Sequence, residues 1–377
     1  FLNCTQINEA FIPTIAISHI GRCASHITIT GGDTIESNAF NNRSNILSIT
    51  INDGVKSILE YAFQRCSNLT SIIIPDSVET IEEMAFYKCD ALQYNLYENG
   101  HYLGNENHPY QWFIKAKNTN ITSCTIHQDT KYIYSRPFEN WNSLTTVVIP
   151  KSVVSIAKDA FTVYCYNLSN AYYEGDIEAW CNLHVQVFPD RSISNHFFLR
   201  NSDNEWEEVK NLVIPDTITE ISDYQFFAFN SLTSISIPSS VKAIGKNAFY
   251  ECTKLEKIQI EHGVESIGNQ AFYYCKDLLS IELPDSINSV GNYAFSNCSN
   301  LKYLIINKGV KEIGKDLIAF TKVDSIYFKG TEEEWKKISI DSTNAKLDSV
   351  TKYFYSETAP TEQGNYWHYV DEIPTKW

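Results

Sequence analysis

Several features that would assign this sequence to a common functional class are missing. No run of about 18 apolar residues occurs, so we expect no membrane-spanning helix. The 15 glycines and 11 prolines are too few for a collagen-like or low-complexity chain. With 30 basic against 45 acidic residues, the net charge is −15. That balance leaves no basic footprint for nucleic acid and disfavours docking on an anionic membrane surface.

Motifs for catalysis and metal binding are also missing. The sequence contains no His-Glu-x-x-His, no phosphate-binding Gly-x-x-x-x-Gly-Lys, no Gly-x-Gly-x-x-Gly and no Gly-x-Ser-x-Gly. Cys-x-x-Cys does not occur, and Cys23-x-x-His26 alone is a weak metal signal. The acidic run 332–334 is interpreted as a helix start, where the helix dipole favours carboxylates. We therefore expect no enzymatic activity, no cofactor and no metal site.

Apolar material, by contrast, is plentiful. The 377 residues are 43% hydrophobic and 13% aromatic, which is enough for a large core and excludes wholesale disorder. The chain starts at Phe1 and has a single methionine, Met84. We therefore expect a trimmed mature chain or a fragment, in which a signal or anchor would be missing from view.

An Ala-Phe pair recurs along the chain with a fixed period. The phenylalanine, or the residue in its place, occurs in blocks of three, two and five with a step of 23 residues inside each block. The ten anchors are Phe40, Phe63, Phe86, Phe138, Phe161, Phe226, Phe249, Phe272, Phe295 and Ile318. Such self-similarity is typical of repeat architectures in which each repeat is one structural coil.

Each repeat has the pattern V-x-x-I-G-x-x-A-F-x-x-C-x-x-L-x-x-I-x-I-P. The L-x-x-I-x-I part alternates with period two and predicts a short half-buried strand, followed by turn residues such as 75–77. We interpret the A-F segment as a single helical or 3₁₀ turn on the opposite side. A period of 23 residues fits a leucine-rich-repeat solenoid, an α/β, β-rich horseshoe whose stacked coils share one core. Its strands should pair in parallel and its coil should be right-handed.

The repeat resembles the BspA-like, treponemal-type leucine-rich repeats. The resemblance rests on Ile72-Ile73-Ile74-Pro75-Asp76-Ser77-Val78-Glu79-Thr80-Ile81, then Ala85-Phe86 and Cys89, and on the further copies of this pattern. It covers nearly the whole chain. The resemblance implies a secreted or cell-surface protein that binds other proteins or matrix.

Two interruptions and two distinct ends modify the array. Asn99-Gly100 between alternating aromatics predicts a hairpin, and Asp176 and Thr331 are expected to cap short helices. We expect one leucine-rich-repeat array over 1–377, with an N-terminal cap or first coil at 1–35, an insertion at 91–120, an insertion with a short helix at 171–211, and a C-terminal helix, strand and cap at 326–377.

Ten cysteines invite a disulfide interpretation. Five of them follow the anchor by three residues, namely Cys66, Cys89, Cys252, Cys275 and Cys298. A fixed repeat position predicts a column of small, buried, reduced thiols, because side chains stacked in a ladder have poor disulfide geometry. Cys4–Cys23 and Cys165–Cys181 could form bridges, and Cys124 lies outside the column.

Two surfaces are candidates for binding. The outward strand positions carry mainly Ser and Thr, with Lys257, Gln259, Glu282, Tyr303 and Tyr327 as their distinctive members. These positions form either a solvated strand face or a concave recognition surface. The insertion concentrates Tyr97, His101, Tyr102, Tyr110 and Trp112. These rings either contact a ligand or cover an open edge of the solenoid.

The sequence is thus interpreted as a non-enzymatic interaction or adhesion module, secreted or displayed on a cell surface. Its expected partner is a protein or an extracellular-matrix or host-surface ligand. A carbohydrate-binding module and a self-assembling scaffold are the alternatives. Neither nucleic acid nor direct membrane insertion is expected.

Overall fold

The computed structural model describes residues 24–117, 120–139, 141–157, 159–161, 167–185 and 196–377, together with the backbone of 9–12. The chain divides into two compact units, Phe1–Leu168 and Ser169–Trp377, and each is described by itself. No helix in the described ranges is long and apolar enough to cross a membrane.

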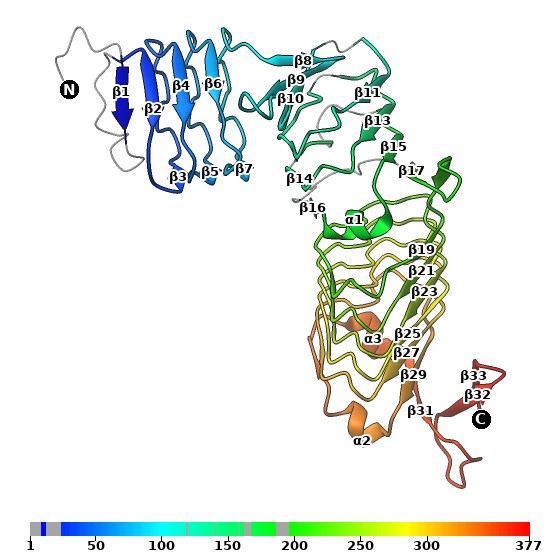
Figure 1. The fold of residues 1–377 in the computed structure, drawn as a ribbon. Helices are drawn as coiled ribbons and strands as arrows, with labels where there is room; N and C mark the ends of the chain where they lie inside the picture. The colour runs from blue at the N-terminus through cyan, green and yellow to red at the C-terminus, as the bar shows by residue number, and fades with distance from the viewer. Residues whose placement is uncertain are drawn as a thin grey trace. The chain divides into compact units, whose positions relative to one another are not determined.

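The first unit is built from short strands. They are β1 (Glu9–Ile12), β2 (His26–Ile29), β3 (Thr34–Ile35), β4 (Ser48–Ile51), β5 (Ser57–Ile58), β6 (Ser71–Ile73), β7 (Thr80–Ile81), β8 (Asn95–Tyr97), β9 (Gly100–Leu103), β10 (Trp112–Ala116), β11 (Ser123–Thr125), β12 (Tyr132–Ile133), β13 (Thr146–Ile149) and β14 (Ser155–Ile156). Strands β1, β2, β4 and β6 form one sheet and β3, β5 and β7 another. The two sheets lie on opposite sides of the stacked coils (Figure 1).

The second unit adds three short helices to the same plan. Its elements are β15 (Asn170–Tyr173), α1 (Ile177–Asn182), β16 (His184–Val185), β17 (His196–Arg200), β18 (Trp206–Glu208), β19 (Asn211–Val213), β20 (Glu220–Ile221), β21 (Ser234–Ile237), β22 (Ala243–Ile244), β23 (Lys257–Ile260), β24 (Ser266–Ile267), β25 (Ser280–Leu283), β26 (Ser289–Val290), β27 (Tyr303–Asn307), β28 (Glu312–Ile313), β29 (Ser325–Lys329), α2 (Glu332–Trp335), β30 (Ser339–Ile340), α3 (Ala345–Ser349), β31 (Thr351–Tyr355), β32 (Tyr366–Val370) and β33 (Ile373–Lys376).

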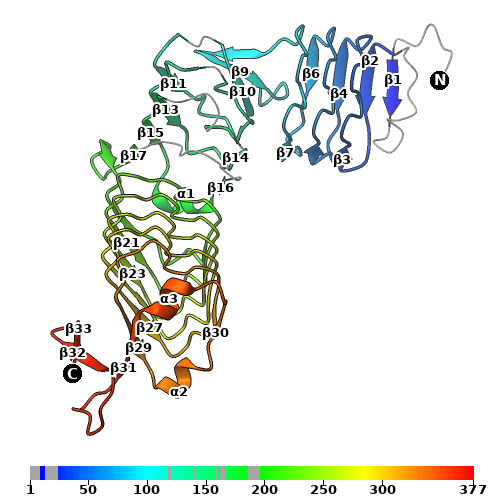
Figure 2. The same ribbon diagram turned by 180° about the vertical axis from the view of Figure 1, so that it is seen from behind.

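Three of the described sheets lie wholly within the second unit. The longer strands form the sheets β19-β21-β23 and β25-β27-β29-β31-β32-β33, and the two-residue strands form β20-β22-β24-β26-β28-β30. The view from behind displays the same stack of coils, with β21, β23, β27 and β29 on one side and β30 on the other (Figure 2).

The strand register follows from the period-two alternation. Ser234 pairs with Lys257, and Ile235 pairs with Ile258, in parallel. Ile235 and Ile237 are buried while the serine between them stays partly exposed. The predicted strand and the outward position of Ser234 are therefore confirmed, and the solenoid fold with them.

The two-residue strands were not predicted, since a strand of two residues is too short to give a periodic signal in the sequence. It explains the glycine in the pattern, however. A Cβ atom at Gly268 would lie 2.7 Å from the carbonyl carbon of Gly245 in the preceding coil. Glycine thus lets the backbones of neighbouring coils approach each other closely.

The Ala-Phe segment differs from the helical turn expected for it. Among the described residues, those two before and two after an anchor adopt the left-handed conformation, for example Asn247 with φ 54° and Glu251 with φ 59°. A left-handed residue ends a right-handed helix at once, so the segment forms consecutive turns instead. Neighbouring turns are joined by bonds such as Phe249 N–H to the carbonyl of Ala271, 2.8 Å.

The core is a stack of anchor rings beside a column of thiols. The rings of Phe249 and Phe272 lie 5.2 Å apart and nearly parallel. The five column cysteines are buried, as predicted, and the described geometry leaves each of them unbridged. The Cys298 thiol donates to the carbonyl of Phe272 at 3.1 Å, and the Cys66 thiol donates to that of Phe40 at 3.2 Å. Burial raises the pKa of Cys66 to about 11, which keeps the thiol protonated.

The predicted helix caps are present. Asp176 accepts from the N–H of Ala179 at the start of α1, and Thr331 forms a capping box with Glu334 at the start of α2. In α1, Trp180 is fully buried and donates its indole N–H to the carbonyl of Gln225. Helix α3 was not predicted. The proposed Cys4–Cys23 bridge and the Cys165 partner of Cys181 lie outside the described residues.

Candidate functional site

The insertion in the first unit folds as the predicted hairpin. Strands β8 and β9 pair in antiparallel fashion through Tyr97 and Gly100, and Glu98 takes the left-handed turn position with φ 45°. A Cβ atom at Gly100 would lie 2.4 Å from the Tyr102 ring, so glycine is required by that ring. Strand β9 pairs with β10, and β10 then rejoins the parallel ladder beside β12.

Two of the predicted contact residues lie inside the protein. Tyr102 is 0% exposed and Trp112 is 2% exposed. The Tyr102 hydroxyl accepts from the N–H of His127 at 3.1 Å, and the Trp112 ring stacks on Tyr132 at 4.3 Å. Neither side chain has surface to offer a ligand. Tyr102 and Trp112 therefore cover the core instead of contacting a ligand, because the insertion has to close the core where the repeat is interrupted.

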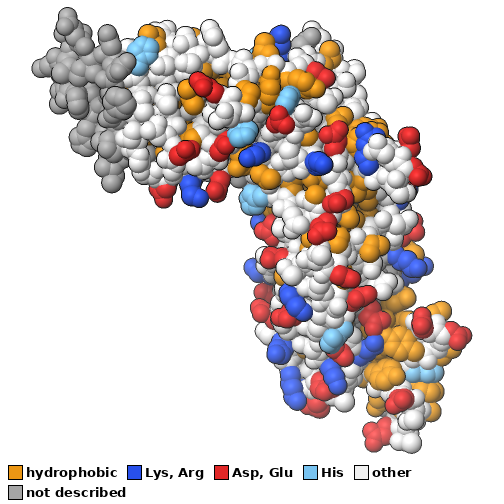
Figure 3. All heavy atoms as spheres, in the orientation of Figure 1, with side chains coloured by type: hydrophobic (Ala, Val, Ile, Leu, Met, Phe, Trp, Pro, Cys, Tyr) orange, Lys and Arg blue, Asp and Glu red, His pale blue; other side chains and the backbone are white. Residues whose placement is uncertain are grey.

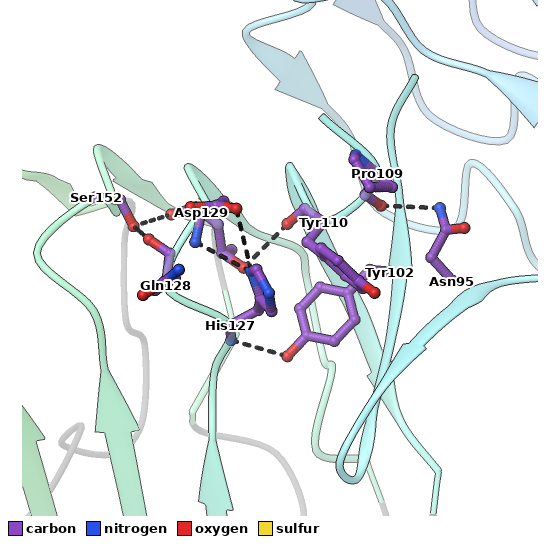
Figure 4. Close-up of polar contacts among 9 residues, drawn as sticks. Asn95, Tyr102, Pro109, Tyr110, His127, Gln128, Asp129 and Ser152 are labelled. Atoms are coloured by element: carbon purple, nitrogen blue, oxygen red, sulfur yellow. Dashed lines mark hydrogen bonds and ion pairs between the residues drawn. The ribbon is translucent and has the colours of Figure 1, made fainter. Parts of the chain in front are cut away.

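Three partly exposed rings meet at the edge of the same insertion. Tyr110 stacks on His127 with ring centres 3.9 Å apart, and Tyr97 meets His127 edge-on at 4.6 Å. We call Tyr97, Tyr110 and His127 the His127 cluster. Figure 4 places the Tyr110 and His127 rings together, with the Tyr102 hydroxyl reaching the backbone of His127.

The ring of His127 is fixed from its other side as well. Its Nδ1 accepts from the N–H of Asp129 at 3.1 Å, an arrangement that places the proton of the neutral ring on Nε2. His127 could not be singled out from the sequence, because it follows the ordinary coil strand β11 rather than the aromatic insertion.

His101 lies apart from this cluster. Its ring stacks on Tyr94 at 5.0 Å, and the ammonium of Lys115 lies 4.6 Å from the Tyr94 ring centre. Burial, followed by the positive charges of Lys115 and Lys117, lowers the pKa of His101. The imidazole is therefore neutral at pH 7 and belongs to a cation–aromatic stack.

The loop after β9 is tied to the preceding coil. The Asp76 carboxylate accepts from the Asn105 amide at 2.8 Å and from His108 Nδ1 at 2.8 Å. Burial would raise the pKa of Asp76, but these two hydrogen bonds outweigh it and the pKa is lowered. Beside this contact lies an open hollow of about 610 Å³, lined by Ile51, Asn52, Asp53, Ile73, Pro75, Asp76, Asn105, Glu106 and Asn107.

The candidate residues of the second unit have different fates. Lys257 and Gln259 are exposed on β23, as expected for outward positions. Glu282 is exposed but engaged, since it pairs with Lys329 at 2.5 Å and accepts from the Tyr369 hydroxyl at 3.2 Å. Burial alone would lower the pKa of Lys329, but the hydrogen bond to the Glu282 carboxylate outweighs burial and raises this pKa.

Tyr303 and Tyr327 are covered by the C-terminal strands. Trp367 on β32 is fully buried and meets the Tyr327 ring at 5.3 Å. Tyr327 is only 7% exposed, and Tyr303 packs against the same cluster. The expectation that Tyr327 is open to a partner is therefore wrong, because the β32–β33 hairpin occupies the face above it. Hydrophobic side chains gather over these C-terminal strands in Figure 3.

A further aromatic surface was not predicted at all. On β15, β17 and β18, the Tyr172 ring stacks on Phe198 at 4.5 Å and meets Trp206 at 5.0 Å. The Arg200 guanidinium lies 4.0 Å from the centre of the Trp206 ring. We call Tyr172, Phe198, Arg200 and Trp206 the hairpin patch. These residues fall in the 171–211 interruption, where the repeat supplies no register.

Neither unit displays a metal centre in its described part. No group of three or more His, Cys, Asp or Glu side chains is placed to hold a metal ion among the residues that the structure describes. The recurring chemistry is instead that of partly exposed aromatic rings held rigidly by stacking.

Comparison with known proteins agrees with the repeat pattern. The family model described as "BspA type Leucine rich repeat region" matches residues 33–114, 113–202 and 191–324 in six copies. No curated protein matches the chain.

Three solved structures are similar to this chain at low identity. A leucine-rich cell surface protein from Faecalibacterium prausnitzii is 24% identical, with 89% of this chain and 86% of that chain covered and a TM-score of 0.44. A leucine-rich repeat protein from Bacteroides ovatus is 23% identical over 85% and 87%, with a TM-score of 0.38. The pneumococcal vaccine antigen PcpA is 18% identical over 94% and 79%, with a TM-score of 0.41. Since the family model spans most of the sequence and the coils match its repeat, the chain belongs to the BspA-type leucine-rich repeat family.

Proposed function

We propose that this protein is a secreted or cell-surface module that binds a protein or matrix partner, and that the His127 cluster supplies the main contacts. The proposal extends what the family supports, which is a repeat protein with an interaction role. It assigns no catalytic step to any residue.

The observation that carries the proposal is the packing of the His127 cluster. Tyr97 and Tyr110 keep part of their rings exposed, yet each is held against His127 at a fixed angle. Rigid aromatic rings bury a large area and lose little conformational freedom when a partner arrives. The regular strands present mainly small hydroxyls, such as Ser71 and Ser280, which are poor anchors for binding.

The test compares these two sets of residues. Binding of the full chain to a panel of immobilised extracellular-matrix proteins is measured by biolayer interferometry. We expect Tyr97→Ala with Tyr110→Ala to weaken binding at least tenfold, a change of about 1.4 kcal/mol. The matched control, Ser71→Ala with Ser280→Ala, should leave affinity within about threefold, roughly 0.6 kcal/mol.

Two outcomes contradict the proposal. Unchanged affinity in the tyrosine variant with a loss in the serine variant places the site on the bare sheet. A lower melting temperature in the tyrosine variant without a change in affinity assigns these rings to covering the core.

A carbohydrate ligand is the second candidate, favoured by the hollow beside Asp76. Its wall offers the amides of Asn52 and Asn107 and the carboxylates of Asp53 and Glu106, groups that can hold sugar hydroxyls. A glycan array separates the two candidates, since a protein-specific module gives no glycan signal. Sedimentation at high concentration tests the remaining alternative, a self-assembling scaffold, which a monomer contradicts.

A further inference from the structure

The parallel ladder of the second unit is interrupted beside β19. Strand β19 is the terminal strand of its sheet and pairs only with β21 there. Ser234 N–H donates to the carbonyl of Lys210, and Ile214 N–H donates to the carbonyl of Ser236. Since alternate residues of a strand face opposite neighbours, the main-chain groups of Asn211 and Val213 face the other edge. No described strand pairs with that edge.

The preceding hairpin turns away instead of continuing the ladder. Strands β17 and β18 pair with each other in antiparallel fashion, and Val209 N–H makes the last main-chain bond to β17, at the carbonyl of Phe197. A groove of about 350 Å³ opens between the hairpin and β19. Ile177, Leu199 and Val209 line it with apolar surface, and Val213 stands 67% exposed at its side.

Some of the charged groups around this groove are already paired, whereas one is available to a partner. The Glu208 carboxylate is already held by His196 and, at 3.3 Å, by Lys210. Arg200 lines the groove, is exposed, and donates through Nη1 to the carbonyl of Asn204 at 2.7 Å. It forms no ion pair with any residue in the described part of the chain. A guanidinium has five N–H donors, so most of them remain available to a carboxylate.

We propose that the free edge of β19 is a docking site for an extended segment of a partner protein, which adds to the sheet as a further strand. Its main chain bonds to Asn211 and Val213, an apolar side chain fills the groove, and an acidic side chain meets Arg200. Exposed strand edges are templates for this kind of pairing. The hairpin patch supplies tryptophan, tyrosine and arginine next to it, the residue types that dominate binding energy.

This site extends the proposed interaction function to the second unit. It uses no residue of the His127 cluster, so failure of either proposal leaves the other standing.

The experiment uses a displayed library of random seven-residue peptides selected on the full chain. We expect enrichment of peptides that alternate apolar residues with Asp or Glu. Val213→Pro removes the N–H on the free edge without removing a bond to β21, and it should weaken the selected peptides at least tenfold. The matched control Val213→Thr keeps that N–H and the branched shape, and should retain affinity within about threefold, a change of roughly 0.6 kcal/mol.

Two further readouts keep the test decisive if Val213→Pro folds poorly. Arg200→Glu should reverse the selected charge from acidic to basic. Hydrogen exchange at 211–213 should slow at least tenfold when a selected peptide is bound, while exchange at 257–260 stays unchanged. Enrichment of no peptide, equal enrichment on Val213→Pro, or protection that leaves out 209–213 overturns the proposal.

Discussion

Truncation of one anchor ring tests the stacked core. Phe272 is 0% exposed, and its ring lies between Phe249 at 5.2 Å and Phe295 at 5.5 Å, nearly parallel to both. Burial of a phenylalanine contributes about 1.5–3 kcal/mol. Each aromatic pair adds about 0.5–1.5 kcal/mol, so two pairs add about 1–3 kcal/mol. Phe272→Ala should therefore lower the free energy of unfolding by about 3–5 kcal/mol, as measured for other buried aromatic residues.

The assay is urea unfolding followed by circular dichroism and tryptophan fluorescence. Repeat arrays can unfold in parts. The dependence of the unfolding free energy on urea concentration must therefore agree between the two signals before free energies are compared. Phe272→Leu is the matched control, since it keeps apolar bulk and loses only the ring pairs, at about 1–3 kcal/mol. A loss below about 1 kcal/mol in Phe272→Ala would refute the register and the stacking that follows from it.

Two further predictions concern the turn and the thiol column. Arg65 is exposed and adopts the left-handed conformation with φ 58°, so Arg65→Gly should stabilise the fold by about 0.5–1 kcal/mol in the same unfolding assay. The control Ser67→Gly, at a position without that conformation, should destabilise the fold. Equal losses in both variants would contradict backbone strain at Arg65. Burial raises the pKa of Cys252 to about 12, so iodoacetamide should label the column thiols only after denaturation, and mass spectrometry that finds bridges between column cysteines would contradict their structural role.

The regular coils could be predicted from the sequence because every part of them repeats. The alternation around Ile235 determined which face is buried, and the constant offset of Cys275 from Phe272 placed that thiol in the core. The two-residue strands and the left-handed turns escaped prediction. Residues such as Tyr274, with φ 64°, have no preference for that conformation and are held in it by the neighbouring coil.

The candidate site was harder to predict, because contacts there join segments distant in sequence. The insertion folds as the predicted hairpin, but its sequence pattern could not distinguish the buried Tyr102 from the partly exposed Tyr97. His127 enters the site from an ordinary coil. Tyr327 alternates like an exposed residue, and the return of Trp367 from the C-terminus helps to bury it.

The central claim is that binding takes place at the interruptions of the repeat rather than on its regular strands. The most direct measurement is a hydrogen-exchange footprint of the full chain with the first matrix protein or selected peptide that binds. We expect slower exchange at 95–110 and 127–129 for a matrix partner, and at 209–213 for a selected peptide. Protection confined to regular strands such as 48–51 or 280–283, with none at the interruptions, would contradict it.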